Sequence, residues 1–150
     1  MFRHLILIMA IGACTTVSFA QRNVTPALDR DPAMEADAKH NLDVAQQAFT
    51  PLKKAYKQVL SRFEETYAAY PTFSKMDEFL YLAGMSSWYL SENKGKQKVD
   101  LRQEKEKEKY DPVRLREDAV AYLNILIEKY PQSKRLDEAR AALKLIEATK

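Results

Sequence analysis

The sequence is poor in glycine, cysteine and histidine, and each scarcity excludes a class of protein. Its 150 residues include only 3 Gly, too few for a β-rich fold with many tight turns. A single Cys excludes both a disulfide scaffold and a cysteine-based zinc site. Two His, one of them near the start of the chain, leave little for metal binding or acid–base chemistry. The net charge of +3 is too small to indicate nucleic-acid binding by itself.

The abundant residues indicate one all-α domain. Ala, Leu, Lys, Glu and Gln dominate after residue 30, and these residues favour helices. The chain is 46% hydrophobic and 30% charged, which is enough for both a core and a solvated surface. We expect a helical protein without cofactor, metal or nucleic-acid partner.

Residues 1–20 have the composition of a signal peptide. Two basic residues at 3–4 precede a short apolar run at 5–11, and Ser18 and Ala20 place small side chains before a cleavage point. The apolar run is too short to span a bilayer. The sequence therefore predicts an exported protein.

Cys14 gives the same segment a second interpretation. Ile11-Gly12-Ala13-Cys14 resembles a bacterial lipobox, in which the cysteine receives the lipid and becomes the mature N-terminus. In the other interpretation Cys14 belongs to the apolar part of a leader that is discarded by cleavage before Gln21. Both alternatives export the protein. Lipidation at Cys14 would also attach it to a membrane.

A flexible tether is expected at residues 21–33, because this stretch is polar and contains two prolines. Apolar residues then recur at helical spacing. The spacing and the prolines predict helices at 34–49, 51–69, 74–91, 112–130 and 134–148.

Proline-containing start signals define several of these boundaries. Thr50 as N-cap with Pro51 in the first turn predicts a helix start there, and a single helix kinked at Pro51 is the alternative. Asp111 with Pro112 predicts the start of the fourth helix.

Serine and threonine side chains are the expected caps of the remaining helices. Thr72 or Ser74 can cap the third helix, and Ser133 can cap the fifth. Pro71 and Pro131 end the helices that precede these caps.

Two features interrupt the helical pattern. Gly84 lies inside the third helix, where glycine costs about 1 kcal/mol relative to alanine, and this predicts close approach of a neighbouring helix. Residues 92–111 alternate lysines with acidic residues and contain few aliphatic side chains. We expect this stretch to be a solvated insertion, part loop and part exposed helix.

The two Tyr-Pro junctions form an internal repeat. Tyr70-Pro71-Thr72-Phe73-Ser74-Lys75-Met76-Asp77-Glu78 aligns without gaps to Tyr130-Pro131-Gln132-Ser133-Lys134-Arg135-Leu136-Asp137-Glu138, sixty residues later. Subtracting a charged insertion of roughly 26 residues leaves about 34, which is the period of a tetratricopeptide repeat.

The repeat resembles the tetratricopeptide-repeat family. Ala119 and Leu123 lie where the family's second helix carries its small and large packing residues, and Phe63 fills the large position of the preceding repeat. Val59 departs from the expected alanine, whereas Gly84 lies near the family's first-helix glycine. The resemblance implies antiparallel helical hairpins, about two and a half repeats.

A narrower resemblance links the junction to envelope proteins. The segment Tyr130-Pro131-Gln132-Ser133, with Glu138-Ala139 after it, is similar to junctions of the outer-membrane assembly lipoproteins, the BamD-like family. That resemblance implies a non-catalytic periplasmic scaffold beside the β-barrel assembly machinery, attached to the inner face of the outer membrane. A soluble repeat protein of the Tol–Pal and peptidoglycan envelope system has similar junctions and is the alternative.

No arrangement of residues indicates an enzyme. His40 has acids on both sides at Asp37 and Asp43, a pattern more typical of a solvated helix face than of a metal site. The pairs Asp77-Glu78 and Asp137-Glu138 recur with the repeat in first helical turns, where carboxylates favour the helix dipole. We expect no catalytic residues.

Aromatic residues of the third helix are the candidates for partner binding. Tyr81, Trp88 and Tyr89 could line a groove that holds a segment of another protein, or they could belong to the core. Trp88 and Tyr89 are adjacent and point about 100° apart on a helix. We therefore expect one of these two to contact a partner.

Overall fold

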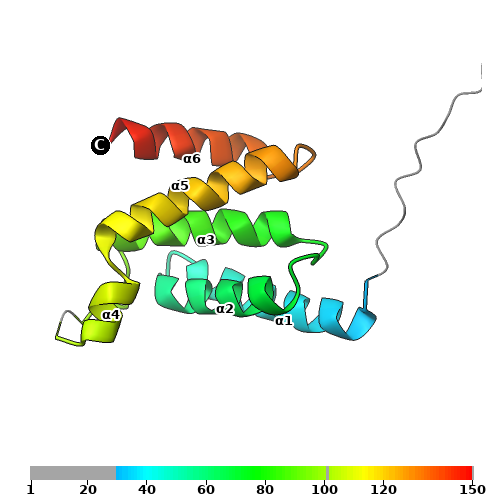
Figure 1. Cartoon of the computed structure of the whole chain (residues 1–150), viewed down its shortest axis with the longest axis horizontal. Helices are drawn as coiled ribbons and strands as arrows, with labels where there is room; N and C mark the ends of the chain where they lie inside the picture. Colours follow the sequence, from blue (N-terminus) through cyan, green and yellow to red (C-terminus); the bar gives the residue numbers. More distant parts are fainter. Residues whose placement is uncertain (1–29, 101, 150) are drawn as a thin grey trace, which may run out of the picture.

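The structure is a computed structural model that describes residues 30–100 and 102–149, and over these residues the chain is all-helical. Five long helices are accompanied by one short helix (Figure 1). Their bounds are α1 Pro32–Phe49, α2 Tyr56–Ala69, α3 Met76–Ser91, α4 Glu104–Lys109, α5 Pro112–Lys129 and α6 Leu136–Ala148. The all-α class expected from composition is confirmed.

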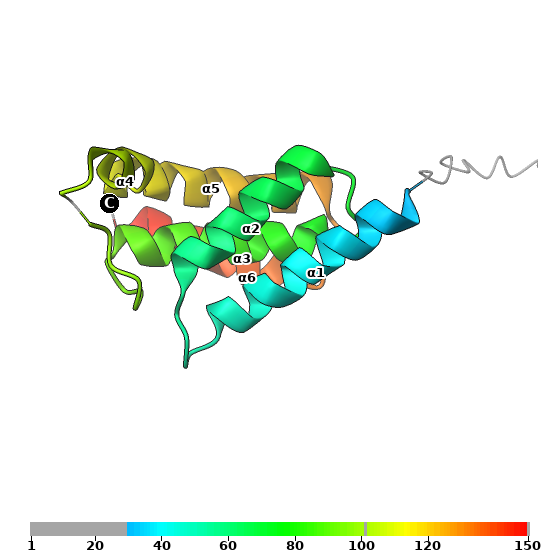
Figure 2. The same cartoon turned by 90° about the horizontal axis from the view of Figure 1, so that it is seen from below.

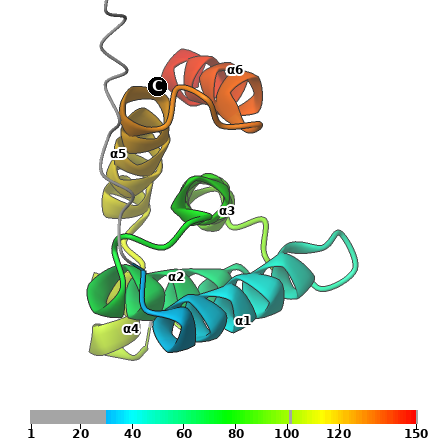
Figure 3. The same cartoon turned by 90° about the vertical axis from the view of Figure 1, so that its right-hand side faces the viewer.

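Helix α3 is the centre of the molecule. It packs against α1, α2, α5 and α6. Seen end-on, it lies between the α1–α2 pair and the α5–α6 pair (Figure 3). Eleven of its sixteen residues are buried, as this position requires. The side of α3 that remains partly exposed is therefore narrow.

The core is a single cluster of buried side chains shared by all five long helices. At its centre the ring of Phe63 from α2 contacts Phe79 of α3 and Tyr122 of α5, with centroids 5.6 and 4.8 Å apart. Both contacts are edge-on, a preferred arrangement of aromatic pairs. Three consecutive long helices are thus joined by one side chain.

The repeat found in the sequence is also a repeat of backbone structure. At each Tyr-Pro junction a helix ends, two turns follow, and the next helix begins at the same offset. At the first junction the amides of Tyr70, Phe73 and Met76 donate to the carbonyls of Thr66, Tyr70 and Phe73, respectively. At the second junction the amides of Tyr130, Ser133 and Leu136 donate to the carbonyls of Leu126, Tyr130 and Ser133. The two junctions therefore adopt one conformation.

Carboxylates near helix starts connect each junction to the preceding hairpin. The carboxylate of Glu35, near the start of α1, accepts a hydrogen bond from the Ser74 amide at 3.2 Å. The carboxylate of Asp77, in the first turn of α3, accepts one from the Ser133 hydroxyl. These bonds and the helix dipole both stabilise the acids there.

The predicted helix start at Pro51 is wrong. Residues 51–53 form one turn, Lys54 has a left-handed φ of 46°, and α2 begins only at Tyr56. The Ala55 amide donates back to the Ala48 carbonyl at 2.9 Å, which closes this loop. Leu52, which falls within the helix predicted at 51–69, lies instead in this loop and is 79% exposed.

Two expected caps also differ from the structure. Helix α3 begins at Met76 without a side-chain cap, because the intervening turn carries Thr72 and Ser74 outside the helix. Helix α6 begins at Leu136, and Ser133 lies one turn earlier, where its hydroxyl accepts from the Arg135 amide at 3.1 Å.

The two Asp-Pro sequences both start helices. Asp111 caps α5 as predicted, and Pro112 occupies its first turn. Asp31 and Pro32 do the same for α1. That earlier start places the last two residues of the expected tether, residues 32–33, inside a helix.

The charged insertion is folded onto the body rather than extending into solvent. Lys57 of α2 donates to the Lys98 carbonyl at 2.6 Å and to the Glu106 carboxylate at 2.9 Å. Lys109 of α4 pairs with Glu64 of α2 at 2.7 Å. The helical part expected within this insertion is α4. Some of the charged side chains that predicted a solvated segment instead attach α4 to α2.

Candidate partner-binding site

The three aromatic candidates of α3 have different environments. Trp88 is only 6% exposed and belongs to the core, whereas Tyr81 and Tyr89 are half-buried. Of the adjacent residues Trp88 and Tyr89, Tyr89 is therefore the one that remains a candidate for contact with a partner. The ring of Trp88 stacks against the ring of Tyr89, with the two centroids 5.3 Å apart.

Tyr89 belongs to an aromatic pocket built from three helices. Its ring lies 6.1 Å from that of Phe49, at the end of α1, and 5.1 Å from that of Tyr56, at the start of α2. The pocket is open, has a volume of about 400 Å³, and is also lined by Lys54 and Lys94. We refer to Phe49, Pro51, Lys54, Tyr56, Tyr89 and Lys94 as the aromatic pocket.

Charge in the aromatic pocket is of one sign. Burial, together with the neighbouring Tyr89, raises the pKa of Tyr56 above its ordinary value, so its phenol is neutral at physiological pH. Lys54 and Lys94 are the only charged residues that line the pocket. The pocket is therefore lined by aromatic rings and two lysines, and the ammonium group of Lys94 lies 5.1 Å from the centroid of the Trp88 ring. This lining suits an aromatic or aliphatic group next to a negative charge.

Two loops hold the rim of the pocket. The Lys96 amide donates to the Lys54 carbonyl at 3.1 Å, and this bond joins the α1–α2 loop to the segment after α3. Gly95 is buried at this contact, where a Cβ would lie 3.1 Å from the Tyr56 ring. Lys54 and Asn93 both have left-handed φ angles, 46° and 53°. Such conformations persist where the surrounding contacts fix them.

Tyr81 belongs to a different region, near the start of α3. The Arg135 guanidinium lies 5.2 Å from its ring centroid and pairs with Glu138 at 2.8 Å. Burial, followed by the adjoining Glu138, raises the pKa of Tyr81 to about 12. The structure thus places Tyr81 against an ion pair of α6, and the aromatic pocket does not include it.

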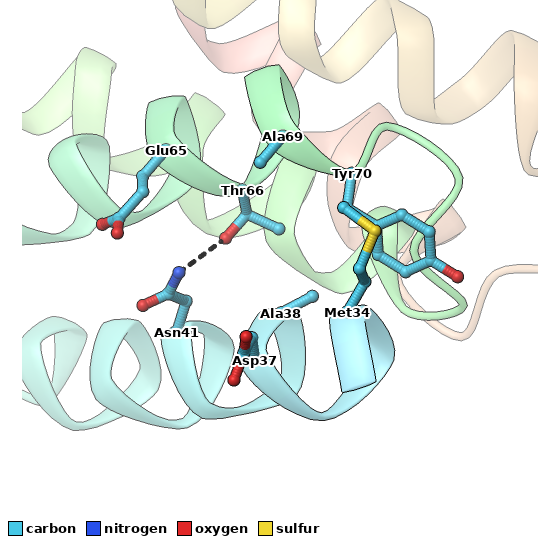
Figure 4. Close-up of a pocket in the computed structure, with 8 residues that line it drawn as sticks. All are labelled: Met34, Asp37, Ala38, Asn41, Glu65, Thr66, Ala69 and Tyr70. Atoms are coloured by element: carbon cyan, nitrogen blue, oxygen red, sulfur yellow. Dashed lines mark hydrogen bonds between the residues drawn. The ribbon is translucent and has the colours of Figure 1, made fainter. Parts of the chain in front are cut away.

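A second pocket follows the seam between α1 and α2 and has a volume of about 180 Å³ (Figure 4). The Asn41 amide reaches across the seam and donates to the Thr66 hydroxyl at 3.2 Å. This hydrogen bond provides a partner for the hydroxyl of Thr66, a residue that is only 2% exposed. The packing of α1 against α2 therefore explains the polar contact along this seam.

His40 and the acidic residues considered as site candidates lie on a helix surface or in contacts between elements of the fold. His40 is exposed on α1. Asp77 accepts from Ser133, and Glu78 accepts from the Gln46 amide at 3.1 Å. Within residues 30–100 and 102–149, no group of His, Cys, Asp and Glu is arranged to hold a metal ion.

The structure does not bear on the predicted leader or its lipidation. Cys14, the candidate lipidation residue, and residues 1–20 lie outside the described residues. Among the helices that the structure does describe, none is long and apolar enough to cross a bilayer.

Sequence reasoning missed most of the aromatic pocket. Phe49 and Tyr56 flank Pro51 and belong to two of the helices that the sequence predicts, 34–49 and 51–69. They meet only because the loop between them folds back on itself and binds the segment that carries Lys94. A long-range backbone bond of this kind has no signal in the local pattern.

Compared with protein-family models, with curated proteins and with solved structures, the chain matches none.

Proposed function

We propose that the protein is a non-catalytic scaffold of tetratricopeptide-repeat type. In this proposal it holds partner proteins beside the β-barrel assembly machinery, at the inner face of the outer membrane. The recurring Tyr-Pro junction and the central position of α3 support the repeat assignment. The leader-like N-terminus and the junction sequence support the location.

The aromatic pocket is the observation that supports a binding role most directly. Phe49, Tyr56 and Tyr89 come from three helices and present ring faces around an open volume of about 400 Å³. Rigid aromatic side chains provide large contact area at low entropic cost and are common centres of binding energy. A segment of a partner that carries an apolar side chain next to a carboxylate would match both the rings and the lysines.

The hydrogen bonds of the acidic residues support a non-catalytic role. Asp77 and Glu78 are engaged in contacts between helices, and Glu138 pairs with Arg135. A general acid or base needs a site next to bound substrate and a pKa suited to proton transfer. Asp77 and Glu78 instead connect neighbouring elements of the fold, and Glu138 forms a local pair three residues from Arg135.

Replacement of Tyr89 tests the proposed binding site. We expect Tyr89→Ala to remain folded by circular dichroism and to lose most capture of the large β-barrel assembly protein in a pull-down from envelope extracts. Tyr67→Ala is the matched control, because Tyr67 is a 39% exposed tyrosine of α2 outside the pocket. Equal capture by both variants would remove the pocket from the proposal. Capture of cell-wall synthases alone would favour the Tol–Pal alternative.

Fatty-acid labelling tests the proposed attachment to the membrane. Radioactive palmitate should label the wild-type chain, and Cys14→Ser should lose the label. A mature protein that begins at Gln21 and carries no label would show that the scaffold is not anchored through this cysteine.

A further inference from the structure

The loop between α1 and α2 protrudes beyond the helices (Figure 2), and it contains an exposed leucine, Leu52. Leu52 is 79% exposed, more than the other large hydrophobic side chains found exposed among the described residues. Lys53 and Lys54 follow it in the sequence, Lys96 donates a hydrogen bond to its carbonyl, and Lys94 belongs to the same segment as Lys96. All four lysines are exposed. We refer to Leu52, Lys53, Lys54, Lys94 and Lys96 as the lysine tip.

Hydrogen bonds gather these residues from two distant segments. The Lys96 ammonium donates to the Leu52 carbonyl at 2.7 Å, and its amide donates to the Lys54 carbonyl. The Lys94 amide donates to the Tyr89 carbonyl at 2.8 Å, which fixes it to the end of α3. The lysine tip is therefore a defined surface.

Positive charge at the lysine tip is not neutralised by the rest of the described chain. None of its four lysines forms an ion pair within residues 30–100 and 102–149, whereas at the opposite end of α3 Lys75 pairs with Glu78 and Arg135 pairs with Glu138. The Lys94 ammonium lies 5.1 Å from the centroid of the Trp88 ring, and the Lys96 ammonium donates to the Leu52 carbonyl. The lysine tip therefore carries four ammonium groups without a carboxylate partner among the described residues.

We propose that the lysine tip docks the protein onto an anionic lipid bilayer. A leucine at the apex can enter the boundary between headgroups and acyl chains, and lysines around it can bind lipid phosphates. Lysine is suited to this position because its methylene stem follows the apolar side chain while its ammonium stays at headgroup level.

The shape of the lysine tip favours a membrane over a protein segment. Leu52 is not among the residues that line the aromatic pocket, and it belongs to the loop between α1 and α2. Peptide segments are often held by grooves and pockets that receive their side chains, whereas an exposed apolar side chain on a protruding loop can enter the interface of a flat bilayer. The lysine tip shares Lys54 and Lys94 with the aromatic pocket, whereas Leu52, Lys53 and Lys96 do not line it. The proposed membrane contact does not depend on a lipid at Cys14.

An environment-sensitive fluorophore at position 52 tests the proposal. The full chain would carry Cys14→Ser and Leu52→Cys, so that the label is attached to one thiol. We expect its emission to shift to the blue with vesicles of equimolar phosphatidylcholine and phosphatidylglycerol. Phosphatidylcholine alone should give little shift. A label at Gln132→Cys, in the loop at the other end of the molecule, should keep its aqueous emission.

Charge-matched variants then test the lysines. Lys53→Gln with Lys96→Gln changes two exposed lysines of the tip that do not line the aromatic pocket. This double change should lower the partition coefficient by about fivefold for each lysine, because each contributes about 1 kcal/mol near an anionic surface. Lys134→Gln with Lys144→Gln removes the same charge from exposed residues outside the tip and should change it little.

Several results would overturn the proposal. They are an unshifted label at position 52, equal partition onto neutral vesicles, or equal losses in the two double variants. An unshifted label combined with lost partner capture in Lys53→Gln/Lys96→Gln would assign these lysines to a protein contact instead. Tyr89→Ala should retain the full emission shift, so failure of the pocket and failure of the tip can be distinguished.

Discussion

Gly84 of α3 and Leu123 of α5 are in such close contact that a side chain at position 84 would collide with the leucine. A Cβ there would lie 2.9 Å from Cγ and 3.0 Å from Cδ2 of Leu123, and 3.4 Å from the Ala119 carbonyl oxygen. Leu123 is fully buried, so it has little room to move. The missing side chain lets the central helix approach α5 closely.

Gly84→Ala should therefore destabilise the protein although it improves helix propensity. Alanine gains about 1 kcal/mol in a helix interior, but overpacking a core costs about 1–3 kcal/mol. We expect a net loss of about 1 kcal/mol in the free energy of unfolding, measured by urea denaturation. In a Leu123→Ala background the same change should stabilise the chain. Additive effects of the two changes would contradict the close contact.

Trp88 should behave as a core residue. Trp88→Ala should cost about 3–5 kcal/mol of stability, as large-to-small changes in cores do. Trp88→Phe should cost less than half of that, because the indole Nε1 has no hydrogen-bond partner among the described residues, and its loss leaves no polar group unpaired. Urea denaturation followed by circular dichroism measures both. A Trp88→Ala variant as stable as the wild type would contradict the assignment of Trp88 to the core.

Local sequence signals predicted the helices but not all of their boundaries. Asp31-Pro32, Thr50-Pro51 and Asp111-Pro112 have the same local pattern, yet a helix begins only at the first and third. At Thr50 the chain instead closes a loop through the amide of Ala55 and the carbonyl of Ala48. Tertiary contacts decide between these outcomes, and they are not encoded in the spacing of apolar residues.

The candidate site shows the same limit. Tyr89 was identified because aromatic residues cluster in the third helix, and Gly84 because glycine is costly there. Phe49, Tyr56 and Lys54 acquire their role only when two loops forty residues apart are joined by the Lys96–Lys54 backbone bond. A repeat pattern predicts which helices are neighbours, but not how loops pair outside the repeat.

The Lys57–Glu106 pair should hold the charged segment on α2. The side chain of Lys57 is only 14% exposed, and loss of its partner would leave a largely buried ammonium group without an anion. We expect Glu106→Gln to speed proteolysis between residues 97 and 109, measured as the rate of fragment appearance. Glu104→Gln is the control, because Glu104 is 82% exposed and pairs within α4. Equal rates for the two variants would show that Lys57 does not hold the segment.

This attachment should also depend on pH. Hydrogen bonds from Lys57 and from the Asp100 amide lower the pKa of Glu106. A carboxyl whose folded-state pKa is lowered stabilises the fold above its ordinary pKa, and this contribution is lost as pH falls through the lowered value. Protease resistance of the segment should therefore decrease at acidic pH in the wild type. In Glu106→Gln the dependence should be weaker, and an unchanged pH profile would contradict the assignment.

Tyr122 should make the fold sensitive to alkaline pH. Burial, followed by the charge of Asp118, raises the pKa of Tyr122 from 10.0 to about 12. A raised pKa means that the folded state favours the neutral phenol. Its contribution is complete below the unfolded value of about 10 and is lost as pH rises toward about 12. The urea midpoint should fall across this range.

Tyr122→Phe keeps the ring against Phe63 and removes the ionisable group, so its decline should be shallower than that of the wild type. Tyr81→Phe should act in the same direction, because Tyr81 also titrates near 12, and the double variant should decline least. The two tyrosines are on α5 and α3 with separate acidic neighbours, Asp118 and Glu138, so their effects should add. Parallel pH profiles for wild type and double variant would show that both phenols ionise freely in the folded protein.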